Sequence, residues 1–125
     1  MSWTLSIHWT LVASVWYFGN GILHDAFVLI KHKGKYDREL LRLLMDGHVL
    51  ILSGAVVFVC WLMMLNKIQY GGLISLIVAA FMLLYCAMIF PFLKSIGTIV
   101  VSVLLIIVSI KAMIDFPVFY NIMQK

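Results

Sequence analysis

Charged side chains are scarce in this sequence. Only 11% of its 125 residues are Asp, Glu, Lys or Arg, and residues 68–93 contain none of them. Apolar residues make up 65% of the chain, and the mean hydropathy is +1.12. A soluble domain is nearer half apolar and a quarter charged, and a fold of this size has too little interior to bury the surplus. The composition therefore excludes a water-soluble fold and indicates that lipid is the solvent.

Cysteine and proline are also rare, with two of each. Cys60 and Cys86 fall within separate apolar segments, at depths that differ by roughly 12 Å if the segments are helices. A disulfide needs Cα atoms within about 7 Å of each other. We therefore expect both cysteines to be free and buried, and the sequence excludes a disulfide-stapled scaffold.

Four apolar segments are each long enough to cross a bilayer, whose hydrocarbon core of about 30 Å takes about 20 helical residues. They must be helices, because open strands would leave backbone groups unpaired in lipid. The sequence predicts an all-α integral membrane protein, a four-helix transmembrane bundle formed by one domain over residues 1–125. The expected spans are 7–30, 42–65, 72–90 and 95–114.

Basic residues concentrate in the segment between the first two spans. Five of the nine Lys and Arg residues lie there, and they are Lys31, Lys33, Lys35, Arg38 and Arg42. Cytoplasmic loops carry such an excess, so we expect loop 31–42 in the cytoplasm, both termini outside (N-out/C-out), and residence in the cell (inner) membrane. Membrane topology therefore explains the excess of positive charge, and we do not expect a nucleic-acid partner. Asp37 is the expected N-cap of a helix that starts at Arg38 and continues into the membrane.

Small residues recur at helical spacing within each predicted span. In lipid, helices associate where small residues let their backbones approach closely. The residues expected at helix contacts are Gly21, Gly47, Gly54, Gly72, Ala79 and Ser102. An alternative interpretation of these rows is a polar pathway through the bundle.

Four ionisable residues lie inside the first two spans. His24 and Asp25 come shortly before the basic loop, and Asp46 and His48 come shortly after it. In an antiparallel hairpin all four would lie roughly 6–10 Å inside the cytoplasmic boundary. Ionisable groups within a membrane usually face the interior and have a partner. We therefore treat these four residues as a candidate intramembrane polar cluster.

Helical geometry allows two pairings in this cluster. Asp46 and His48 are about 200° apart around their helix, so all four groups cannot converge. His24 shares a face with the small residues of the first span, which favours pairing His24 with Asp46. The alternative is Asp25 with His48. Arg42, one turn before Asp46, is a candidate charge partner for it.

The cluster and the layout favour a non-enzymatic membrane protein, either a homo-oligomer or an accessory subunit of a larger membrane complex. No catalytic motif is present. The alternative is a small transporter or a proton- or ion-handling protein that uses the cluster. A haem or metal site is a third interpretation, but His8 lies about 24 Å from His24 along one helix and the sequence has no spaced ligand motif. No cofactor is predicted, and the identity of any metal stays open.

Overall fold

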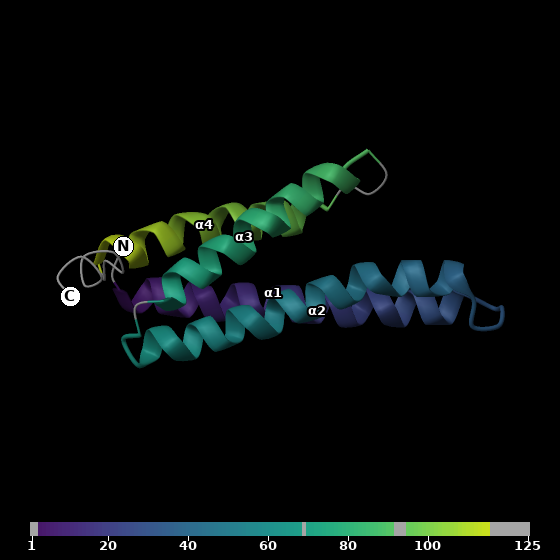
Figure 1. The fold of residues 1–125 in the computed structure, drawn as a ribbon, viewed down its shortest axis with the longest axis horizontal. Helices are drawn as coiled ribbons and strands as arrows, with labels where there is room; N and C mark the ends of the chain where they lie inside the picture. The colour runs from purple at the N-terminus through teal and green to yellow at the C-terminus, as the bar shows by residue number, and fades with distance from the viewer. Residues whose placement is uncertain (1–2, 69, 92–94, 116–125) are drawn as a thin grey trace.

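A computed structural model describes residues 3–68, 70–91 and 95–115. This part of the chain forms four α-helices, namely α1 (Trp3–Lys31), α2 (Arg38–Leu65), α3 (Tyr70–Ile89) and α4 (Ile96–Asp115). Figure 1 shows them as two antiparallel hairpins, α1 with α2 and α3 with α4, laid against each other. The predicted helical bundle is confirmed at this level.

Three helices are long and apolar enough to cross a membrane, and they are α2, α3 and α4. α1 has 29 residues but is not among them. Its sequence includes His8, Asn20, His24 and Asp25, which dilute the apolar content of any long window. The prediction of four membrane-spanning helices is therefore supported for three of them.

The four helices form a ring in which each packs on the next and α4 closes on α1. The contact between α1 and α2 is the most extensive. Side chains from all four helices meet in the centre, where Tyr17, Val57, Met82 and Leu105 are almost fully buried. Cys60 and Cys86 are free and buried, as predicted.

Glycines set the close approach of α1 and α2. A Cβ atom added to Gly21 would lie 2.6 Å from the carbonyl oxygen of Gly47, and one added to Gly54 would lie 2.7 Å from the backbone nitrogen of Phe18. Real Cβ atoms do not approach other atoms so closely, so the two helices can pack at this distance only without those side chains.

Local signals fix both ends of α2. Asp37 is its N-cap, and its carboxylate accepts a hydrogen bond from the Leu40 backbone N–H at 2.8 Å, which confirms the predicted start. At the other end Lys67 has a φ of 56°, and the Ile68 N–H donates to the Met63 carbonyl at 2.8 Å. Helices commonly end with a residue in the left-handed conformation and a hydrogen bond of this kind.

Candidate functional site

Asp25 and His48 join α1 and α2 within the apolar part of the hairpin. His48 Nδ1 lies 2.9 Å from Asp25 Oδ2 and 2.8 Å from the Leu44 carbonyl oxygen. Both of these oxygens are acceptors, so Nδ1 carries the hydrogen and the lone pair of a neutral ring is on Nε2. This is the pairing that the sequence left as the alternative.

Gly47 makes room for the Asp25 carboxylate. A Cβ atom on Gly47 would lie 1.9 Å from Asp25 Oδ1, so the carboxylate rests directly against the α2 backbone. The Asp25 side chain is 13% exposed, whereas the His48 side chain is 69% exposed. The pair therefore runs from the seam between the helices to the outer surface of the hairpin.

His24 flanks this pair on the other side. Its Nδ1 is 3.7 Å from Asp25 Oδ1, which is too long for a hydrogen bond. Both atoms are buried and have no hydrogen-bond partner. Asp25 thus lies between two imidazoles, bonded to one and merely close to the other.

Asp46 points away from this group. It accepts a short hydrogen bond from the Tyr85 hydroxyl on α3. The favoured pairing of His24 with Asp46 is therefore wrong, because Asp46 faces α3 while His24 lies beside the seam with α2. Tyr85 was not singled out from the sequence, since a single tyrosine in an apolar segment has no distinctive pattern.

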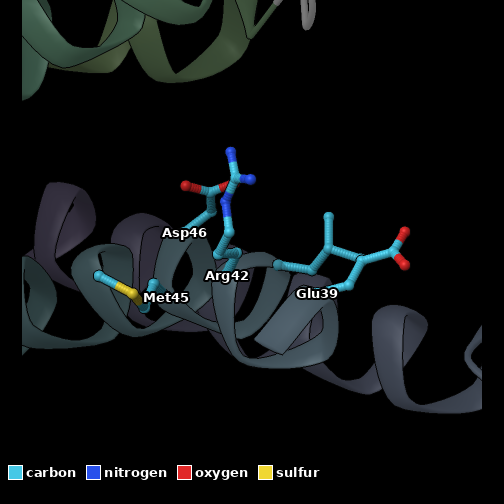
Figure 2. A pocket seen from close by; sticks show the side chains of 5 residues that line it. Glu39, Arg42, Met45 and Asp46 are labelled. Atoms are coloured by element: carbon cyan, nitrogen blue, oxygen red, sulfur yellow. The ribbon is translucent and has the colours of Figure 1, made fainter. Parts of the chain in front are cut away.

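An open pocket of about 510 Å³ lies beside Asp46 at the end of α2 near the basic loop. Its lining includes Glu39, Arg42 and Asp46, and Figure 2 shows Arg42 and Asp46 projecting from the same side of α2. The ion pairs among the described residues all join a histidine to an aspartate. Arg42 therefore borders the same pocket as Asp46 without the ion pair that the sequence suggested.

Buried hydroxyl groups link other neighbouring helices. Tyr17 on α1 and Ser102 on α4 share a hydrogen bond of 2.7 Å, as do Ser75 on α3 and Ser109 on α4. Ser14 on α1 donates to the Gly54 carbonyl on α2 at 2.9 Å. Together with the hydrogen bond between Asp46 and Tyr85, these bonds join every pair of neighbouring helices in the ring. Gly72 and Ala79 are also buried in α3.

The outer face of the α1–α2 hairpin carries an open apolar groove of about 530 Å³. A Cβ atom on Gly19 would meet nothing within 4 Å. We call this surface the outer face. It comprises the groove and, further along α2, the exposed side chain of His48. The groove is lined by Ser14, Val15, Phe18, Gly19, Gly54, Ala55, Phe58 and Val59.

The described residues contain no group of three or more His, Cys, Asp or Glu side chains arranged to hold a metal ion. Comparison of the chain with protein-family models, with curated proteins and with solved structures gave no match. The features of this chain that bear on its function are therefore the cluster, the pocket and the outer face.

Proposed function

We propose that this protein is a non-enzymatic integral membrane protein that acts as a self-associating subunit, with the outer face of the α1–α2 hairpin as its contact surface. The observation that carries the proposal is the exposure of the His48 side chain. Its imidazole is 69% exposed on a helix that is apolar enough to cross a membrane. A polar side chain on such a helix normally faces protein or water, because contact with hydrocarbon is unfavourable.

The contacts inside the chain support an assembly role over a transport channel through the bundle. The polar groups at the centre bond to one another across neighbouring helices, as Tyr17 does with Ser102. Three of the grooves beside these helices are open at the surface and are lined mainly by apolar side chains. Helix packing uses these interior groups and leaves the outer face without a partner in the single chain.

A second copy is the occupant that this face fits best. Two copies inserted in the same direction are related by an axis along the membrane normal, which brings equal depths together. The two His48 rings then meet, and one imidazolium can donate to the other imidazole while each Asp25 carboxylate stabilises the charge. Phe18 and Phe58 form ridges beside the open space at Gly19, so the face offers both protrusions and gaps.

Cysteine cross-linking tests the proposal. In a background with Cys60→Ala and Cys86→Ala, Ala55→Cys should give a disulfide-linked dimer in vesicles at low protein density. Ile107→Cys on α4, where Ile107 is 51% exposed, is the matched control and should remain monomeric. Equal cross-linking at both positions would mean that the contact is unspecific and would overturn the proposal.

Replacing the exposed imidazole tests its part in the contact. His48→Leu should weaken dimerisation about 3- to 20-fold, which corresponds to the energies of polar contacts measured within membranes. Helix content and thermal stability in detergent serve as the check that the chain still folds. Native mass spectrometry that finds only monomer, or a complex with a different protein, would contradict self-association, and the second result would instead indicate an accessory subunit.

The pocket beside Asp46 favours a second candidate function, proton or ion handling. Its volume of about 510 Å³ is large enough for water, and Asp46 is both a pocket wall and the acceptor for Tyr85. Carboxylates at such positions in membrane proteins often take up and release protons.

A flux measurement tests this second candidate. Purified protein in vesicles that contain a pH-sensitive dye should conduct protons when a gradient is applied, and Asp46→Asn should abolish the flux. The matched variant Asp25→Asn should leave the flux unchanged, because Asp25 on α1 lies against Gly47 and His48 and is not among the residues that line the pocket. Wild-type vesicles that are no leakier than empty ones would rule out proton conduction.

A further inference from the structure

The loop between α1 and α2 presents a group of cations that form no ion pair with any described residue. Lys33, Lys35 and Arg38 are exposed, and none of them takes part in an ion pair within the part of the chain that the structure describes. Lys31, at the end of α1, lies 4.6 Å from the centre of the Phe27 ring. At the opposite end of the bundle the described cations are Lys67 and Lys111.

The loop is folded so that its acid is used internally. Asp37 caps α2 through the Leu40 N–H, and its Oδ1 also lies 3.5 Å from His32 Nε2. The same imidazole nitrogen is 3.4 Å from the Lys35 carbonyl oxygen. These contacts hold the turn together and occupy the Asp37 carboxylate. The exposed cations of the loop still outnumber the nearby acid, Glu39, which is also exposed.

The length of the α1–α2 hairpin determines how far this loop lies beyond the hydrocarbon core. α2 has 28 residues and is about 42 Å long, whereas a hydrocarbon core is about 30 Å thick. α3 and α4 have 20 residues each, which matches the core. The short connection from α2 to α3 keeps the hairpins level at one end, and Figure 1 shows the α1–α2 loop at the other end of the molecule. The surplus of about 12 Å therefore carries the basic loop to the depth of lipid phosphates.

We propose that the loop formed by residues 31–38 is a binding site for the headgroups of anionic phospholipids. The ligand is a phosphodiester whose acyl chains lie against the hairpin, with Lys33, Lys35 and Arg38 around the phosphate. Basic residues beside a membrane helix attract anionic lipids in this way. The inference depends on membrane insertion and not on self-association, so either proposal can fail without the other.

Native mass spectrometry of the full chain tests the site. The protein is reconstituted in phosphatidylcholine with a minority of phosphatidylglycerol, and the ratio of the two lipids that remain bound is measured. The wild type should be enriched in phosphatidylglycerol. Each cation near the surface contributes roughly fivefold, so the triple variant Lys33→Gln, Lys35→Gln, Arg38→Gln should lose at least about tenfold in this preference.

Two comparisons decide the source of the effect. The matched variant Lys67→Gln, Lys111→Gln removes the two cations at the other end and should keep the enrichment. Added inorganic phosphate should not displace the lipid, because it lacks the acyl chains. The proposal is overturned if the triple variant keeps the preference, if the control loses it equally, or if inorganic phosphate displaces the lipid and so shows a site for soluble anions.

Discussion

Gly47 is a position where one added methyl group should destabilise both the polar pair and the helix contact. The Cβ of Gly47→Ala would lie 1.9 Å from Asp25 Oδ1 and 2.9 Å from the Gly21 carbonyl oxygen. The first contact must displace the carboxylate that bonds to His48, and the second is a close contact with the α1 backbone. Overpacking of this kind costs about 1–3 kcal/mol, and a lost hydrogen bond to a charged group adds about 1.5–3 kcal/mol.

Part of this loss is offset within the helix. Alanine is favoured over glycine inside a helix by about 1 kcal/mol. The net expectation for Gly47→Ala is therefore a destabilisation of about 1.5–5 kcal/mol. Gly19→Ala is the matched control, because a methyl group there meets nothing within 4 Å and the same helix preference should leave the protein unchanged or about 1 kcal/mol more stable.

The assay is reversible unfolding in mixed detergent micelles, followed by loss of helical circular dichroism. Asp25→Ala removes the atom nearest to the new methyl group. The double variant Gly47→Ala, Asp25→Ala should therefore cost less than the sum of the two single losses. If Gly47→Ala is as stable as Gly19→Ala, or if the two losses are simply additive, the Asp25 carboxylate does not rest on the α2 backbone and the reasoning is refuted.

Three further predictions use the same assay. Asp25→Asn and His48→Ala should show a coupling energy of about 0.5–2 kcal/mol, and additive losses would mean that the two side chains do not meet. Tyr17→Phe removes a buried hydroxyl hydrogen bond and should cost about 1 kcal/mol, while Tyr36→Phe at an exposed position should change nothing; equal effects would contradict the buried bond. Lys67→Gly should stabilise the protein by about 1 kcal/mol, since glycine adopts the left-handed conformation without strain, and a loss of stability would show that the turn differs.

The helical and largely apolar character of the chain was predictable from its amino-acid sequence. Uninterrupted apolar segments such as residues 68–93 have no other stable form in lipid, and α2, α3 and α4 are long and apolar enough to cross a membrane. The start of α2 was also predictable, because the cap at Asp37 is a local interaction between residues three apart. Membrane orientation, self-association and the role of the cluster stay predictions from the sequence.

Which members of the polar cluster meet depends on the packing of the helices and was not predictable from the sequence. Asp46 and His48 lie on either side of Gly47 around α2, so the rotation of this helix selects the one that joins α1. The small-residue face of α1 favoured His24, and with it Asp46, whereas packing turned the glycine row of Gly47 and Gly54 toward α1. Asp46 was thereby directed to Tyr85 and His48 to Asp25. Periodicity places residues on a face of a helix, but the partner of that face depends on how closely the neighbouring backbones can approach.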